Sequence, residues 1–207
     1  MADVPEPKMF AAHHKNLPPN FPTHRHSAEF WEALGRTVAT FGFLEQMLGK
    51  AVFSFTATRR IPDDEIEAEY ERWLPTLKRA LSDPLGGLIK SYCKAVRANS
   101  NATITEADLD DLLNDLRKVS TYRNVLCHGS WSIPDAQGRS IPFFVDKNIR
   151  KFDTPIDVAF LQRLQGHVAE LTCDVINTVT HMGWQFPGSG GPGTPIFQSQ
   201  HGNAREG

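Results

Sequence analysis

The sequence predicts an all-α protein, an up-and-down bundle of four to five helices with a small β-hairpin inserted before the last helix. Three observations lead to this fold class. Apolar residues recur at spacings of three, four and seven through most of the chain between residues 27 and 186, which is the period of an α-helix. Capping and helix-breaking residues separate these stretches. At about 130–146, β-formers flank a turn that contains Asp135 and Gly138.

Length and composition support a single globular domain. The chain has 207 residues, of which 40% are hydrophobic, enough for a substantial core. Its longest apolar runs are far shorter than the roughly 20 residues that cross a bilayer, and its start lacks the apolar region of a signal peptide. The three cysteines form no CxxC pair and are expected to be reduced thiols. We therefore expect a cytoplasmic protein without membrane association.

Two tails are expected around the helical domain. Residues 1–26 are rich in Pro and His, and residues 187–207 begin with a Gly- and Pro-rich run, so both are predicted to be flexible or disordered. The helical domain then covers residues 27–186. The first tail carries four histidines with no Asp, Glu or Cys close by, which favours incidental histidines over a metal site and leaves metal binding by them open. They are His13, His14, His24 and His26.

The first half of the domain is expected to hold three helices. Ser27 is the predicted N-cap of a long amphipathic helix that ends near residues 56–60. A second helical stretch covers residues 64–81 and is interrupted by Pro75. Asp83-Pro84 then starts a third helix, which reaches about residue 98.

The second half is expected to hold two helices on either side of the hairpin. Thr105 and Asp108 resemble a capping box at the start of a leucine-rich helix that continues to about Leu126 and stops at Gly129. Thr154-Pro155 is expected to open the last helix, with Pro in its first position.

Two charged residues fall inside apolar helical stripes. Arg123 follows Leu109 and Leu116 at spacings of seven, and a guanidinium in that position is costly unless it is paired. Glu45 occupies a similar inward position on the first helix. We expect Glu45 and Arg123 to form an ion pair. The spacing alone leaves open whether that pair is structural or functional.

A histidine follows closely on the same helix. His128 comes five residues after Arg123 and directly before Gly129. In a continuous helix the side chains of Arg123 and His128 would differ by about 140° in direction. An end or unwinding of the helix at Cys127 is expected to bring them to one site. Cys127 completes an apolar run and is interpreted as structural.

The segment Arg123-Asn124-Val125-Leu126-Cys127-His128 resembles the R-x4-H signature of HEPN domains. These are small all-α bundles found in bacterial toxin and defence systems and in RNA-processing proteins, and many are metal-independent ribonucleases. The resemblance implies that Arg123, Asn124 and His128 are catalytic, that Glu45 supports them, and that no metal or cofactor takes part. It also implies a homodimer, with an antitoxin or other regulatory protein as a further partner.

The chemistry implied by the resemblance suits these side chains. The ribose 2′-hydroxyl of RNA is the nucleophile, so the enzyme transfers protons and stabilises charge on the phosphoryl oxygens. His128 is suited to the proton transfers and Arg123 to the phosphate, while Asn124 orients either group. The products would carry a 2′,3′-cyclic phosphate and a 5′-hydroxyl. A toxin or antiviral defence effector is the implied biological role.

Residues 117–151 contain seven cations and two anions, a local charge of +5 in a chain with a net charge of −2. The charge alone leaves two interpretations open, an anion-binding surface or an ordinary solvated surface. The residues expected to contact RNA are Lys118, Trp131, Lys147, Arg150 and Lys151. For Trp131 the alternatives are stacking on a base and packing on the helical bundle. The alternative is a noncatalytic helical module that binds protein or RNA, in which the basic window is a docking patch and Arg123, Glu45 and His128 form a polar network.

Overall fold

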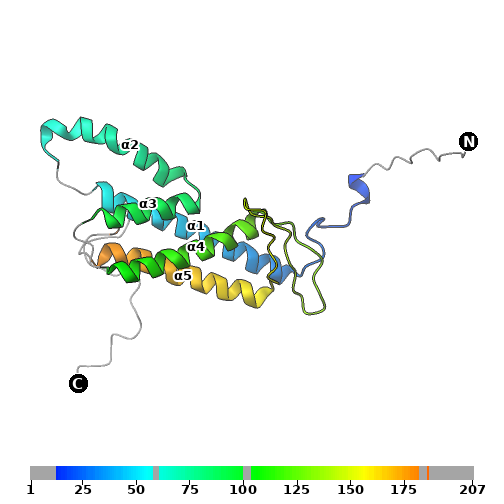
Figure 1. Ribbon diagram of the computed structural model, residues 1–207. Helices are drawn as coiled ribbons and strands as arrows, with labels where there is room; N and C mark the ends of the chain where they lie inside the picture. Colours follow the sequence, from blue (N-terminus) through cyan, green and yellow to red (C-terminus); the bar gives the residue numbers. More distant parts are fainter. Residues whose placement is uncertain (1–12, 58–60, 100–103, 182–185, 187–207) are drawn as a thin grey trace, which may run out of the picture.

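The computed structural model describes residues 13–57, 61–99, 104–181 and 186. Within them lie five α-helices whose successive members run in alternating directions, as predicted for an up-and-down bundle (Figure 1). Two 3-10 turns, η1 and η2, precede α1 and α2. The elements are η1 (His14–Asn16), α1 (Ala28–Ala57), η2 (Asp63–Glu65), α2 (Ile66–Ser82), α3 (Leu85–Arg97), α4 (Glu106–His128) and α5 (Val158–Thr180).

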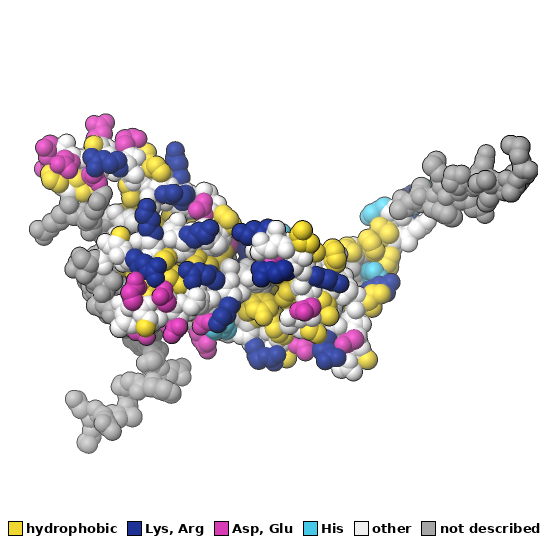
Figure 2. Space-filling view, viewed as in Figure 1, with side chains coloured by type: hydrophobic (Ala, Val, Ile, Leu, Met, Phe, Trp, Pro, Cys, Tyr) yellow, Lys and Arg dark blue, Asp and Glu magenta, His cyan; other side chains and the backbone are white. Residues whose placement is uncertain are grey.

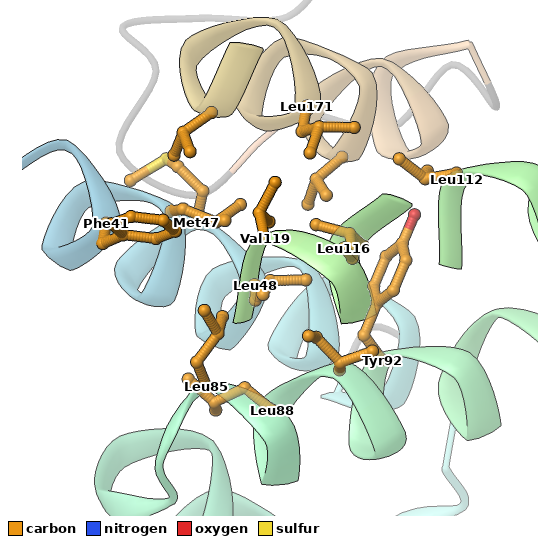
Figure 3. Packing of buried hydrophobic residues seen from close by; sticks show 14 of the residues in the cluster. Phe41, Met47, Leu48, Leu85, Leu88, Tyr92, Leu112, Leu116, Val119 and Leu171 are labelled. Carbon is orange, nitrogen blue, oxygen red and sulfur yellow. The ribbon is translucent and has the colours of Figure 1, made fainter. Parts of the chain in front are cut away.

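The long helix α1 is the centre of the bundle. It contacts all four other helices and packs most extensively on α5. Leu48 is fully buried and lies between Leu85 and Leu88 of α3 and Val119 of α4 (Figure 3). None of the described helices is both long enough and apolar enough to span a lipid bilayer. The packing around Leu48 fixes the position of α1 relative to α4, and these two helices carry the candidate site residues.

The helix starts follow local capping chemistry. Ser27 Oγ accepts a hydrogen bond from the Phe30 backbone N–H at 3.2 Å, which confirms the predicted N-cap of α1. Thr105 Oγ1 accepts one from the Asp108 backbone N–H at 3.1 Å and confirms the predicted start of α4. The Thr105 hydroxyl also donates to the Asp108 carboxylate at 2.6 Å, in place of the reciprocal backbone contact of a capping box.

Two predicted helix boundaries are wrong. α2 continues through Pro75, because an exposed proline removes only one backbone donor while the apolar side of the helix still packs on α1. α5 begins at Val158, where the Asp157 carboxylate accepts from the Phe160 N–H at 2.7 Å. Thr154-Pro155 lies before this cap, in a segment whose Ile156 pairs with Ser140.

The predicted β-hairpin at about 130–146 is also wrong. Within the described residues this region forms isolated antiparallel bridges and no strand, and one of its bridges pairs Ser140 with Ile156, outside the predicted hairpin. Pro134 and Pro142 contribute to this outcome because proline has no N–H to donate to a ladder. The β-formers of this segment instead belong to a long loop, residues 129–157, at the end of the bundle where α1 and α5 begin (Figure 1).

Two similar turns engage four backbone donors of this loop. Asp135 and Asp146 each accept from the backbone N–H groups two and four residues later, at 2.8–3.0 Å. Each carboxylate also accepts from the Nε of the arginine four residues on, Arg139 or Arg150, at 2.9 Å. These contacts, led by the backbone N–H of that arginine, lower the pKa of both carboxyls. Side chains thus satisfy donors that a β-ladder would otherwise use.

An aromatic cluster joins the segment before α1 to the long loop. The His26 ring stacks on Phe30 with ring centres 4.4 Å apart, and Trp131 packs edge-on against Phe30 at 5.0 Å. The Trp31 indole N–H donates to the Thr23 carbonyl at 2.8 Å. Thus the last residues of the predicted tail 1–26 contact the bundle, while residues 1–12 and 187–207 of the two predicted tails lie outside the described residues.

The cluster makes folding stability depend on pH. His26 Nε2 is buried with no hydrogen-bond partner among the described residues, and burial lowers the pKa of His26. Between this lowered pKa and the unfolded value of about 6.5, the unfolded chain binds more protons, so stability rises with pH in that window. His26→Phe should reduce the slope of unfolding free energy against pH, measured by urea titration from about pH 5 to about pH 7.5. Identical slopes for both proteins would contradict this.

α1 and α2 approach each other closely at Gly49. A Cβ at this position would lie 2.7 Å from the Ala80 carbonyl oxygen, which is backbone and cannot rotate away. Gly49→Ala should therefore destabilise the fold by about 1–3 kcal/mol, although alanine favours a helix.

Gly42 is the matched control in the same helix, since a Cβ there meets no atom within 4 Å. Gly42→Ala should stabilise the protein by about 0.5–1 kcal/mol. Urea unfolding of both variants measures the contrast, and a stabilising Gly49→Ala would refute the close approach.

Candidate functional site

Arg123 and Glu45 form the ion pair that their inward positions predict. Arg123 Nε donates to Glu45 Oε1 at 3.1 Å and links α4 to the middle of α1. The side chains are 23% and 25% exposed, so the pair is neither sealed in the core nor free in solvent. No described residue accepts a hydrogen bond from the two terminal Nη groups of Arg123. Glu45 therefore positions the guanidinium and leaves its forked end available to an anion.

The pair lines a groove of about 700 Å3 between α1 and α2. From α1 come Glu45 and Gln46 at its polar end, Lys50 in the middle and Phe53 farther along, while Trp73 contributes from α2. Gln46 is exposed and Lys50 half-buried, and neither has an ion pair or hydrogen bond among the described residues. The groove thus combines two cations, the carboxylates of Glu45 and Asp83, an unpaired amide and aromatic rings.

His128 is the last residue of α4, and its side chain is exposed. Gly129 then ends the helix, with its N–H donating to the Val125 carbonyl at 2.8 Å. A Cβ on Gly129 would lie 2.8 Å from the Pro142 ring, so glycine lets the long loop fold back over the helix end. Ser130 pairs there with Phe143. His128 is consequently held at the junction between α4 and the loop.

The expected unwinding at Cys127 does not occur. α4 is helical through His128, so Arg123 and His128 leave the helix about 140° apart in direction. His128 does not line the groove that holds Arg123. Cys127, which was interpreted as structural, is exposed, and Asn124 is exposed on the same turns of α4. One chain therefore presents the motif residues on different sides of one helix.

The predicted RNA-contacting cations divide into paired and unpaired groups. Lys118 donates to Asp115 at 2.8 Å and Arg150 pairs with Asp146 at 2.8 Å, so neighbouring carboxylates offset both charges. Lys147 and Lys151 are exposed and have no ion pair among the described residues. Figure 2 shows Lys and Arg side chains spread over the face formed by α3 and α4, with acidic side chains gathered at the outer end of α2. The surface formed by residues 117–151 thus carries less unpaired positive charge than its composition indicates.

Trp131 belongs to the aromatic cluster described above. It is half-buried, and its ring lies edge-on to Phe30, Trp31 and His26 at centre distances of 5.0 to 6.4 Å. The structure thus brings Trp131 together with the start of α1 and separates it from the groove of Arg123. Phe143 is the exposed aromatic side chain of this loop.

A second cavity, of about 470 Å3, lies between α4 and α5 and is acidic. Its carboxylates are Asp108, Asp111, Asp115 and Asp174. Burial, with help from the nearby Glu170, raises the pKa of Asp174. Four carboxyls in one cavity repel a phosphate, which leaves the groove of Arg123 as the better anion site.

Several groove residues were not found in the sequence as site candidates. Lys50, Phe53 and Trp73 belong to amphipathic stretches and carry no motif, and their convergence depends on how α2 packs on α1. The spacing of Gln46, Lys50 and Phe53 along one side of α1 is the available signal. Within the described residues, no group of three or more His, Cys, Asp or Glu side chains is arranged to hold a metal ion.

Comparison of the chain with protein-family models, with curated proteins and with solved structures gave no match.

Proposed function

We propose that the protein is a cytoplasmic, metal-independent endoribonuclease of the HEPN type. It cleaves RNA by attack of the 2′-hydroxyl and leaves 2′,3′-cyclic phosphate ends. Arg123, Asn124 and His128 form its catalytic set, with Glu45 in support. Its biological role would be that of a toxin or antiviral effector held in check by an antitoxin or other regulatory protein.

The observation that carries the proposal is the state of Arg123. Its Nε is held by Glu45 at 3.1 Å, while its Nη groups meet no acceptor among the described residues and the side chain lines an open groove. A guanidinium that serves only a structural pair is expected to use its fork on that partner. Here the fork is available to a phosphoryl group, and a fixed cation of this kind stabilises charge that develops in a transition state.

The directions of the two motif side chains support a homodimer. Because Arg123 and His128 point about 140° apart on a continuous helix, one chain does not direct both toward one phosphate. A second copy with α4 facing the first would supply the missing side chain. Light scattering coupled to gel filtration should give twice the 23.1 kDa mass of one chain, and a monomer at all concentrations would contradict the dimer.

The test is cleavage of total cellular RNA by the purified protein in excess EDTA. Arg123→Ala and His128→Ala, purified identically and checked for folding by circular dichroism, reveal any contaminating nuclease. The proposal requires RNA fragments from the wild type and intact RNA with both variants. Equal cleavage by all three proteins, or none by the folded wild type, would support the noncatalytic binding module in its place.

A further inference from the structure

We infer that the groove between α1 and α2 binds one nucleotide of the RNA, with its phosphate at Arg123 and its base against Phe53 and Trp73. The inference rests on the proposed function for the phosphate at Arg123 and extends it to base recognition. The groove of about 700 Å3 falls within the usual range for small-molecule sites, about 300 to 1,000 Å3.

The groove has the length that one nucleotide needs. Glu45, which holds Arg123, and Phe53 are eight residues apart on α1, or about 12 Å along the helix axis. This is comparable to the reach of a nucleotide from its phosphate to the far edge of its base. Lys50 lies between the two ends and has no ion pair among the described residues, so it is available to the phosphate or ribose.

The far end of the groove is aromatic and fixed. Phe53 is 40% exposed and meets Trp73 with ring centres 5.5 Å apart at 70°. The Trp73 indole N–H already donates to Thr56 Oγ1 at 2.9 Å, which fixes the ring and leaves its π surface for contact. Aromatic rings beside cations are the usual platform for single-stranded nucleic acid bases. A purely apolar ligand would offer no anionic group to Arg123 and Lys50 of the groove.

Two further polar groups of the groove are suited to distinguishing bases. The Gln46 amide offers both a donor and an acceptor and is not engaged by other described residues. Asp83, at the turn between α2 and α3, offers acceptors only. Hydrogen bonds from such groups to a base edge discriminate among the four bases. We therefore expect the protein to prefer one base or one base class next to the cleaved phosphate.

The test is binding of the four nucleoside 3′-monophosphates, measured by isothermal titration calorimetry on the full chain. The wild type should bind one or two of them best, and Phe53→Ala should weaken that binding about tenfold or more. Phe43→Ala is the matched control, because Phe43 lies on the same helix, is 44% exposed and does not line the groove. Gln46→Ala changes an exposed side chain and should alter the order of preference among the four nucleotides.

Cleavage of oligonucleotides that differ in one base is measured in parallel and separates the two proposals. If the wild type cleaves RNA but no mononucleotide binds, or if Phe53→Ala and Phe43→Ala behave alike, the nucleotide site is refuted and the nuclease stands. If nucleotides bind, Phe53→Ala weakens them and nothing is cleaved, the groove is a nucleotide site and the nuclease proposal fails.

Discussion

His128→Ala is expected to lower the rate of RNA cleavage by two to four orders of magnitude, the usual contribution of a general acid or base. The variant should fold normally, because the His128 side chain is exposed at the end of α4 and has no hydrogen bond to other described residues. Single-turnover cleavage of a labelled RNA measures the rate, and urea unfolding measures the stability.

His167→Ala is the matched control for this loss. His167 is also an exposed helical histidine, but it lies on α5, where it faces Glu170 at 3.7 Å. Cleavage by His167→Ala should match the wild type. If the two histidine variants lose the same activity, or if His128→Ala keeps the wild-type rate, His128 has no part in the chemistry.

Arg123→Lys separates the catalytic role of Arg123 from its structural one. Lysine keeps the positive charge that faces Glu45, so the free energy of unfolding should change by less than about 1 kcal/mol. The forked geometry of the guanidinium is lost, and cleavage should fall about 10²-fold or more. Arg123→Ala should lose both activity and stability, because Glu45 is then half-buried without a partner.

Rates and urea unfolding of both Arg123 variants provide the comparison. A fully active Arg123→Lys protein would mean that only the positive charge is needed. It would contradict the claim that cleavage requires the forked guanidinium. An Arg123→Lys protein that is as unstable as Arg123→Ala would show that the Glu45 contact depends on the guanidinium.

Much of the fold could be predicted because it is coded locally. The apolar period of α1 and α4 and the caps at Ser27 and Thr105 depend on residues close together in the chain, and all are found in the structure. The hairpin was predicted wrongly because the pattern of β-formers does not show which hydrogen-bond partners their backbone finds. Asp135 and Asp146 bind the backbone of their own turns, and Ser140 pairs with the distant Ile156, so the β-formers have no ladder to join.

The ion pair of the site could be predicted from the sequence, but the groove beside it could not. Glu45 and Arg123 could be paired because two inward charges of opposite sign in one core have few other partners. The groove could not be predicted, because it depends on the close approach of α1 to α2 at Gly49. Gly129 ends α4 as expected, but Cys127 and His128 remain helical up to it, where an end or unwinding of the helix was expected.

The central claim is that the protein cleaves RNA through its 2′-hydroxyl without a metal. The most direct measurement uses an RNA oligonucleotide with one mapped cleavage site and a copy that carries a single 2′-deoxyribose at that site, both in excess EDTA. We predict that the RNA is cut to a 2′,3′-cyclic phosphate and a 5′-hydroxyl, identified by mass spectrometry, and that the substituted copy stays intact. Cleavage of the substituted copy, or products with a 5′-phosphate, would contradict the proposed chemistry.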